Sequence, residues 1–455
     1  MSAFSGWKRR RPRLGPERQE ALRSFARRGR EVLLFSAVAG ALTGLGVALF
    51  ERLVVDVYNG FLDLSPWLLA WMPLCGLVLS AVVLRYIARS DSTATTDAYL
   101  QAFHDPMRYG LRGRELSGRM LAALATLGFG GAMGLEGPSI YLGASIGTGV
   151  QRHVRRLTKT VDARMLLVAG AAGGVAAIFK APATGAIFAV ESPYQNDLAR
   201  RMLLPSLVGA VSSYLVFVAI NGTTPLFPAH GIPPFSFVDL AGAALIGVAA
   251  GLAAHGFSRL LLWAKNLSIT VTAPYRIAGS GLLLAASFGI TYQLTGKPIG
   301  IGVGYNTIDW ALAGRQAVWL LVFVLVERCF ATAATVAGGG VGGLFIPLVV
   351  AGALLGRATV EAVGDTHTTL FVVVGVAAFL SAGYRVPLAA VMFVAETTGR
   401  PGFVVPGVIA AVVAELVMGR ASVSRYQRAG ITTQPPDAEP EPPDPQDDDK
   451  PPRHG

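Results

Sequence analysis

Glu136 is the residue of this chain whose type and setting point most directly to chemistry. It lies in the stretch Gly134-Leu135-Glu136-Gly137-Pro138, and Pro138 indicates that a helix begins here, because proline suits a first helical turn. Free backbone N–H groups and the helix dipole make such an end attractive to anions. The two glycines allow a ligand to approach the backbone closely. We predict an anion site in which Glu136 competes with the anion as a gate; the alternative is a carboxylate that only satisfies free N–H groups.

A second helix start of the same kind follows later in the chain. The stretch Gly343-Leu344-Phe345-Ile346-Pro347 repeats the spacing of the first, with phenylalanine in place of the glutamate. Two such starts that face one point would bind a monovalent anion through backbone N–H groups, without any fixed positive side chain. The backbones of Leu135, Glu136, Gly137, Leu344 and Phe345 are therefore the predicted anion ligands.

The two helix starts belong to an internal repeat. Sliding residues 119–147 by 209 positions onto 328–356 aligns arginine, threonine, proline and five glycines, and residues 179–191 resemble 384–396 at an offset of 205. The halves run over roughly 31–222 and 237–419. Paired segments interrupted by Gly and Pro in corresponding halves indicate a transporter substrate site where the repeats meet. Ancient duplication with ordinary packing through small residues is the alternative.

The composition determines the elements that must position these residues. Of 455 residues, 52% are hydrophobic, only 15% are charged, and 54 are Gly. An average soluble domain has about 25% charged residues, so the chain lacks the polar residues to cover a water-exposed surface. We predict an all-α polytopic protein embedded in a lipid bilayer. Segments such as 343–356 look too short to cross alone, and broken backbone is tolerated in a membrane only where protein or a wet cavity surrounds it.

The two ends of the chain differ in charge. Residues 1–30 carry ten Lys and Arg, which predicts a basic cytoplasmic arm, and we expect the protein in the cell (plasma) membrane. No aromatic or Gly-Arg pattern accompanies the arm, so a nucleic-acid partner is not expected. Residues 432–455 are rich in Pro and acidic residues and are predicted to be disordered.

The predicted tail gives a first testable expectation. Deletion of residues 433–455 should leave assembly and transport intact, because the tail has almost no large apolar side chains with which to dock. Anion flux from liposomes that contain the purified truncated protein checks this. A truncated protein that purifies normally but supports no flux would contradict it.

Enzymatic and metal chemistry find little support in the sequence. The two cysteines, Cys75 and Cys329, lie in separate apolar runs, and the six histidines are scattered without ligand spacing. We expect no metal site. Neither a cofactor motif nor a nucleophile–base pair is found in the apolar segments, so we expect no cofactor and no enzyme.

The motifs together resemble those of the CLC family of chloride channels and chloride/proton antiporters. GLEGP (134–138) is similar to the family's G-[KR]-E-G-P motif and GLFIP (343–347) to its G-x-F-x-P motif, and residues 179–191, 302–305 and 385–399 also match. The resemblance implies two inverted-topology repeats of broken and tilted helices, and a homodimer with one pore in each subunit. It also implies that Glu136 is the gating glutamate.

Several positions depart from the family pattern. The family's G-S-G-x-P motif, whose serine coordinates chloride, is absent, and Thr93, Thr95 or Thr96 is expected to supply a hydroxyl instead. The family's coordinating tyrosine falls near Ser424, with Tyr426 two residues further on. Leu135 replaces the basic residue of the first motif.

The inner proton position bears on mechanism. The resemblance places Ser192 where many antiporters of the family carry a second acid. Glu191 and its repeat partner Glu396 are interpreted as buried carboxylates at helix ends, not proton carriers. We therefore expect transport of chloride or a similar small monovalent anion that is channel-like or weakly coupled to protons. The alternative is a chloride/proton antiporter with Glu136 as the external proton acceptor.

Overall fold

The computed structural model describes residues 16–106, 108–155, 162–195, 197–224, 236–364 and 367–430, and only the backbone of residues 16–28. Within these ranges the protein is almost entirely helical, which confirms the predicted all-α membrane fold. The predicted tail, 432–455, and the first half of the predicted N-terminal arm lie outside the described residues.

The helices divide into two sets of eight. The first set is α1 (Pro16–Leu62), α2 (Pro66–Val83), α3 (Thr96–His104), α4 (Gly113–Gly128), α5 (Glu136–Val154), α6 (Ala163–Phe179), α7 (Pro182–Glu191) and α8 (Leu203–Asn221). The second is α9 (Phe237–Thr270), α10 (Ala273–Thr295), α11 (Tyr305–Leu312), α12 (Val318–Ala337), α13 (Phe345–Val363), α14 (Thr368–Tyr384), α15 (Pro387–Thr398) and α16 (Val404–Met418). Short turns of π-helix (Leu84–Ala88) and 3₁₀-helix (Arg200–Met202, Pro401–Phe403) adjoin α2, α8 and α16.

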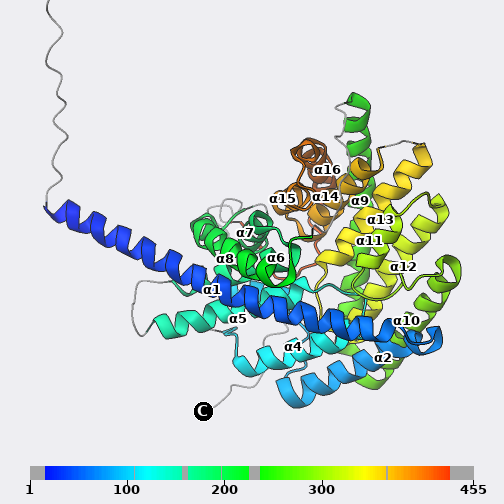
Figure 1. Ribbon diagram of the computed structural model, residues 1–455, viewed down its shortest axis with the longest axis horizontal. Helices are drawn as coiled ribbons and strands as arrows, with labels where there is room; N and C mark the ends of the chain where they lie inside the picture. The colour runs from blue at the N-terminus through cyan, green and yellow to red at the C-terminus, as the bar shows by residue number, and fades with distance from the viewer. Residues whose placement is uncertain are drawn as a thin grey trace, which may run out of the picture.

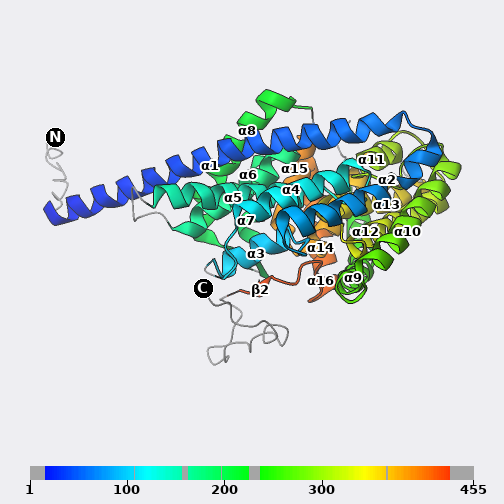
Figure 2. The ribbon, with the colours of Figure 1, turned by 90° about the horizontal axis from the view of Figure 1, so that it is seen from below.

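The predicted repeat is visible in the helix bounds. Helices α5 and α13 each have 19 residues, and α6 and α14 each have 17. The halves meet where α2 packs against α10 and where α7 packs against α15 (Figures 1 and 2). A parallel pair of two-residue strands, β1 (Tyr194–Gln195) and β2 (Arg428–Ala429), ties the end of the described chain to the residues after α7.

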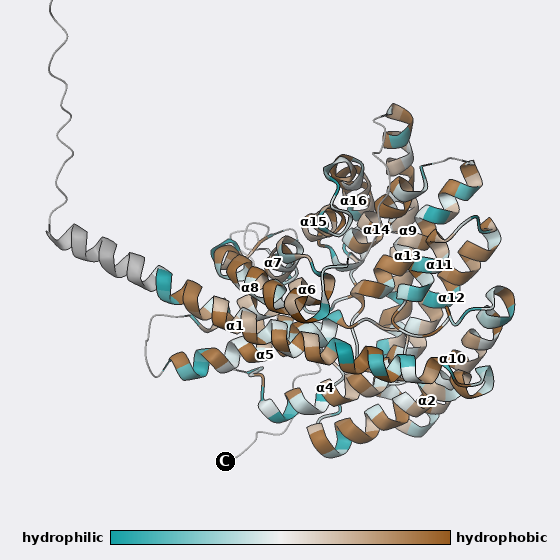
Figure 3. Ribbon diagram, in the orientation of Figure 1, coloured by the Kyte–Doolittle hydropathy of each residue, from teal (hydrophilic) through white to brown (hydrophobic). Residues whose placement is uncertain are grey.

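Eight helices of the described part are long and apolar enough to cross a membrane, and apolar residues cover much of the helical surface in Figure 3. Large apolar side chains such as Trp67 and Leu245 point outward. One expectation fails: α13 has 19 residues and is long enough to cross by itself. The apolar run ends at Arg357, but the helix continues because Arg357 pairs with Glu361 one turn later, at 2.5 Å.

The first helix begins inside the basic N-terminal segment. Helix α1 begins at Pro16, so it includes the second half of the basic segment before it enters the apolar run. Figure 1 shows this end of α1 extending beyond the other helices. The Glu, Gln, Ala and Arg residues of this segment are good helix formers, which explains why the helix starts earlier than the apolar pattern.

Glycine pairs bring α5 against α6 and α13 against α14. A Cβ atom on Gly143 would lie 2.1 Å from the carbonyl oxygen of Gly170, and one on Gly352 would lie 2.4 Å from that of Gly375. Backbones can approach this closely only where side chains are absent. Close glycine contacts in both halves thus hold α5 against α6 and α13 against α14. They also position the starts of α5 and α13, which carry the predicted site.

Candidate anion-binding site

The two helix starts meet at a two-fold junction. The Gly134 N–H donates to the Gly343 carbonyl at 2.9 Å, and the Gly343 N–H donates to the Gly134 carbonyl at 2.7 Å. Hydroxyls on α4 and α12 brace the junction: Thr126 Oγ1 accepts from the Val341 N–H at 3.0 Å, and its repeat partner Thr335 accepts from the Ala132 N–H at 3.1 Å. Reciprocal contacts of this kind are those of repeats related by a two-fold axis.

The Glu136 carboxylate lies in this junction, on the start of the other half's helix. Its side chain is 1% exposed, and Oε1 accepts the backbone N–H of Phe345 at 2.5 Å. The backbone amide of Ile346 is also near, whereas Oε2 has no hydrogen-bond partner among the described residues. The carboxylate thus occupies the positive end of α13, where an anion would bind.

The glycines of both motifs are required by this packing. A Cβ atom on Gly134 would lie 1.9 Å from Glu136 Oε2, and one on Gly343 would lie 2.2 Å from Oε1. A Cβ on Gly137 would lie 2.5 Å from the Thr95 hydroxyl. The structure therefore brings Leu135, Glu136 and Gly137 together with Leu344, Phe345 and Thr95.

Aromatic rings form the wall beside α13. The Phe345 ring packs against Phe179 and Phe393, with ring centroids 4.4 and 5.0 Å apart, and against Phe188 and Tyr384 at 5.7 and 6.3 Å. Phe179 and Tyr384 are the last residues of α6 and α14 and occupy equivalent positions in the two repeats. Tyr384 is the functional candidate that the sequence interpretation missed. The signal was the hydroxyl that distinguishes Tyr384 from its repeat partner Phe179.

The two threonines differ in their hydroxyl contacts. Thr95 Oγ1 donates to the carbonyl of Gly342 at 3.0 Å, and the side chain is 4% exposed. Thr96, the first residue of α3, is also buried; its hydroxyl lies beside that of Tyr384 and has no other hydrogen-bond partner among the described residues. Both threonines therefore lie at the site, but the Thr95 hydroxyl donates its proton to a carbonyl, whereas the Thr96 hydroxyl contacts only Tyr384 among the described residues.

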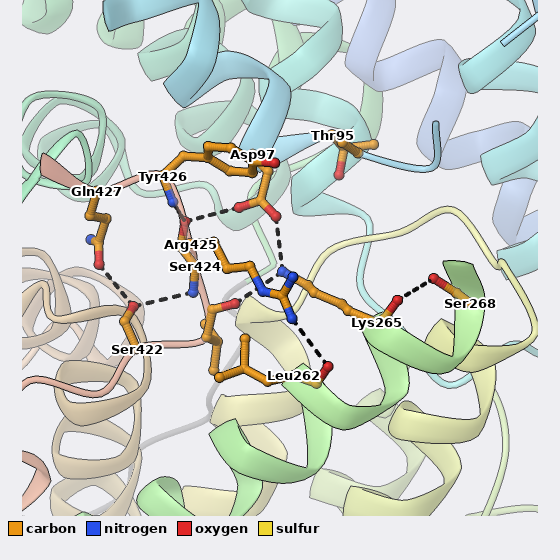
Figure 4. A network of polar contacts seen from close by, with 12 residues as sticks. Thr95, Asp97, Leu262, Lys265, Ser268, Ser422, Ser424, Arg425, Tyr426 and Gln427 are labelled. Atoms are coloured by element: carbon orange, nitrogen blue, oxygen red, sulfur yellow. Dashed lines mark hydrogen bonds and ion pairs between the residues drawn. The ribbon is translucent and has the colours of Figure 1, made fainter. Parts of the chain in front are cut away.

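The structure places the Ser424 hydroxyl in a polar network with α3 and α9. Ser424 Oγ donates to Asp97 Oδ1 at 2.9 Å, and Asp97 Oδ2 pairs with Lys265 Nζ, also at 2.9 Å (Figure 4). Tyr426 is 41% exposed. Figure 4 shows Thr95 apart from this network. The segment that carries Ser424 and Tyr426 is thus fastened to α3 and α9 beside the site.

Glu191 and Glu396 each cap a helix of the opposite half. The Glu191 carboxylate accepts the N–H groups of Leu388 and Ala389 on α15, at 3.0 and 2.8 Å. Glu396 accepts those of Ala183 and Thr184 on α7, at 2.8 and 2.7 Å. These contacts agree with the interpretation of both residues as helix-end carboxylates.

Ser192 lies directly after α7 and is 1% exposed. Its hydroxyl has no hydrogen-bond partner in the described part of the chain, whereas its carbonyl accepts from Gln427 Nε2 at 3.0 Å. Ser192 therefore presents a hydroxyl that does not titrate near neutral pH at the predicted inner proton position.

Two buried arginines that align in the repeat donate hydrogen bonds to loop carbonyls. Arg119 Nη1 donates to the carbonyl of Ala94 at 2.8 Å, just before α3, and Arg328 Nη2 donates to that of Gly302 at 3.0 Å, just before α11. Among the described residues, no group of three or more His, Cys, Asp or Glu side chains could hold a metal ion. Backbone amides and hydroxyls are therefore the donors that surround the Glu136 carboxylate.

Comparison with known proteins agrees with this geometry. The sequence profile of the family described as "Voltage gated chloride channel" matches residues 75–419. The chain is 26% identical to the H(+)/Cl(-) exchange transporter ClcA of Citrobacter koseri over 409 residues, 85% of each chain, and equally identical over 408 residues to that of Salmonella paratyphi B.

Solved structures show the same fold. A slow cyanobacterial Cl-/H+ antiporter superposes with a TM-score of 0.74 at 22% identity, over 85% of this chain and 94% of that one. A CLC-type fluoride/proton antiporter superposes with a TM-score of 0.75 at 19% identity, over 88% and 98%. The fold extends over nearly the whole of both neighbours.

Proposed function

The chain belongs to the voltage gated chloride channel (CLC) family, and on that premise we propose that it exchanges chloride for protons across a membrane. The family and the exchange transporters among its relatives support anion transport. The observation that carries the proposal is the Glu136 carboxylate on the Phe345 amide, because a proton acceptor there holds the place of the anion.

Exchange follows from this competition. When Glu136 is ionised, its carboxylate occupies the amides at the start of α13 and excludes the anion. When Glu136 takes up a proton it loses its charge, so its hold on those amides weakens and an anion can replace it. If the protonated carboxyl releases its proton to one side while the anion leaves to the other, each cycle moves the two ions in opposite directions.

A channel-like pathway is the second candidate, and the sequence alone favours it. The specific observation for it is Ser192, which offers no titratable group at the inner proton position. The relatives named as exchange transporters favour the exchanger over this candidate. We therefore place the exchanger first.

We also propose a homodimer in the plasma membrane with a cytoplasmic N-terminus. The cluster of Lys and Arg before the first apolar run supports the orientation. The family resemblance supports the pairing of two subunits, each with its own pore. Cross-linking in native membranes and protease access to an N-terminal tag test the two statements.

Chloride-driven proton uptake tests the proposed function. Purified protein in liposomes, clamped to zero voltage by potassium and valinomycin, should move protons uphill when a chloride gradient is imposed. Anion flux without proton movement would establish the channel-like candidate instead. Absence of both fluxes, in liposomes shown to contain folded protein, would contradict anion transport itself.

A further inference from the structure

We propose that the hydroxyls of Tyr384 and Thr96 are the side-chain donors that bind the transported anion beside Glu136, in place of any hydroxyl from residues 420–430. This inference rests on the proposed function and deepens it. It assigns a halide-binding role to a residue at the end of α14, within the second repeat.

Tyr384 is placed to reach the anion position. Its side chain is 3% exposed, and its hydroxyl lies beside the backbone amide of Leu344 and the Thr96 hydroxyl. The ring is held edge-on by Phe188 at 5.5 Å, and Gln427 Nε2 donates to the Tyr384 carbonyl at 2.8 Å. The phenol is thus fixed at the start of α13, next to the amides that Glu136 now occupies.

Counting hydroxyl protons separates the candidates. A hydroxyl donates one proton. Thr95 donates its proton to a carbonyl, and Ser424 donates its proton to a carboxylate. Thr96 and Tyr384 face each other: the Thr96 hydroxyl has no acceptor among the carbonyls and carboxylates of the described residues, and the Tyr384 hydroxyl lies beside Thr96 and the Leu344 amide, which is a donor. Thr96 and Tyr384 are therefore hydroxyls at the site that can donate a proton to an anion.

The charges around the pair suit an anion that binds and leaves. Glu136 and Asp97 are carboxylates that act electrostatically on the Tyr384 hydroxyl, and Lys265 pairs with Asp97. The starts of α3 and α13 direct their positive ends at the pair, since Thr96 and Phe345 are the first residues of these helices. Protonation of Glu136 removes one negative charge and admits a monovalent anion.

The repeat makes this donor set asymmetric. Phe179, the counterpart of Tyr384, presents a bare ring to Phe345 at a centroid distance of 4.4 Å. One half of the molecule therefore contributes an apolar wall and the other a hydroxyl. A polar ligand is expected on the Tyr384 side of the Phe345 ring.

Chloride binding to the purified protein in detergent, measured by calorimetry, tests the inference. The variants are made in a Glu136→Gln background, which removes the competing carboxylate. Tyr384→Phe and Thr96→Val should each weaken binding about tenfold, equivalent to about 1.4 kcal/mol. Thr96→Ser, which keeps the hydroxyl, should bind close to the parent.

A matched control removes a hydroxyl whose proton is already donated to a carbonyl. Tyr99→Phe removes a buried phenol on α3 that donates to the Ala189 carbonyl at 2.6 Å, and it should not weaken binding by as much. Parent-level binding by folded Tyr384→Phe would overturn the role of Tyr384. If that variant does not fold, the comparison of Thr96→Val with Thr96→Ser decides, and equal binding by those two overturns the inference. A parent that binds no chloride would instead contradict the proposed function.

Discussion

Replacement of Glu136 by alanine is expected to abolish proton transport while anion flux continues. Among the described residues, the Glu136 carboxyl is the acidic group bonded to the amides at the start of α13, and 1% of the residue's surface is exposed. Without it, no proton is exchanged for the anion there, and the anion site is open permanently. Proton uptake should fall to the level of protein-free liposomes in Glu136→Ala, and chloride efflux from the same liposomes should remain measurable.

Replacement of Glu136 by alanine or glutamine should also remove the pH dependence of anion flux. In the parent protein, anion flux should rise as pH falls, because the anion can displace the protonated Glu136 carboxyl. At pH values above the titration range of Glu136, the protonated fraction falls by up to about tenfold per pH unit. Glu136→Gln is always neutral, so its flux should be nearly constant with pH.

Glu361→Gln is the control for these measurements. It removes a carboxyl from the far end of α13, where Glu361 pairs with Arg357, and should leave both coupling and pH dependence intact. Parental pH dependence in both Glu136 variants would show that another group is the gate.

The main features of this site could be predicted from the sequence because short-range rules fix them. The spacing of Gly and Pro around Glu136 and its repeat predicted two facing helix starts, and α5 and α13 begin 209 residues apart, as the repeat requires. The helix-end positions of Glu191 and Glu396 followed from the same alignment. Each of these features depends on a local pattern and on the two-fold symmetry.

The hydroxyls of the site depend on long-range packing and could not be predicted in the same way. Ser424 was assigned to the position of the family's coordinating tyrosine by aligning a segment that has no repeat or periodicity. In the structure its hydroxyl donates to Asp97, which lies 327 residues earlier in the chain. Tyr384 looked like one more aromatic residue in a repeated motif. Only the approach of α3 to the end of α14 reveals that its hydroxyl meets Thr96.

Removal of either capping carboxylate is expected to destabilise the fold severely. Glu191→Ala leaves the N–H groups of Leu388 and Ala389 without their acceptor, and Glu396→Ala does the same to Ala183 and Thr184. Each buried N–H left without a partner costs about 1–3 kcal/mol, so the loss of two should cost roughly 2–6 kcal/mol. Thermal unfolding in detergent, followed by size-exclusion chromatography, measures the loss.

Glutamine at the same positions distinguishes capping from proton transfer. An amide keeps one oxygen as an acceptor but cannot carry a proton, so Glu191→Gln should be destabilised less than Glu191→Ala. If Glu191 only caps α15, the surviving Glu191→Gln protein should exchange chloride for protons at the parental ratio, and Glu396→Gln should behave alike. If Glu191 instead passes protons to Glu136, Glu191→Gln should lose proton uptake while Glu396→Gln retains it. Glu396 is the reference because it caps α7 as Glu191 caps α15, with one additional hydrogen bond from the Thr184 hydroxyl at 2.6 Å. A loss of proton uptake in Glu191→Gln alone would point to the position of Glu191 beside Ser192.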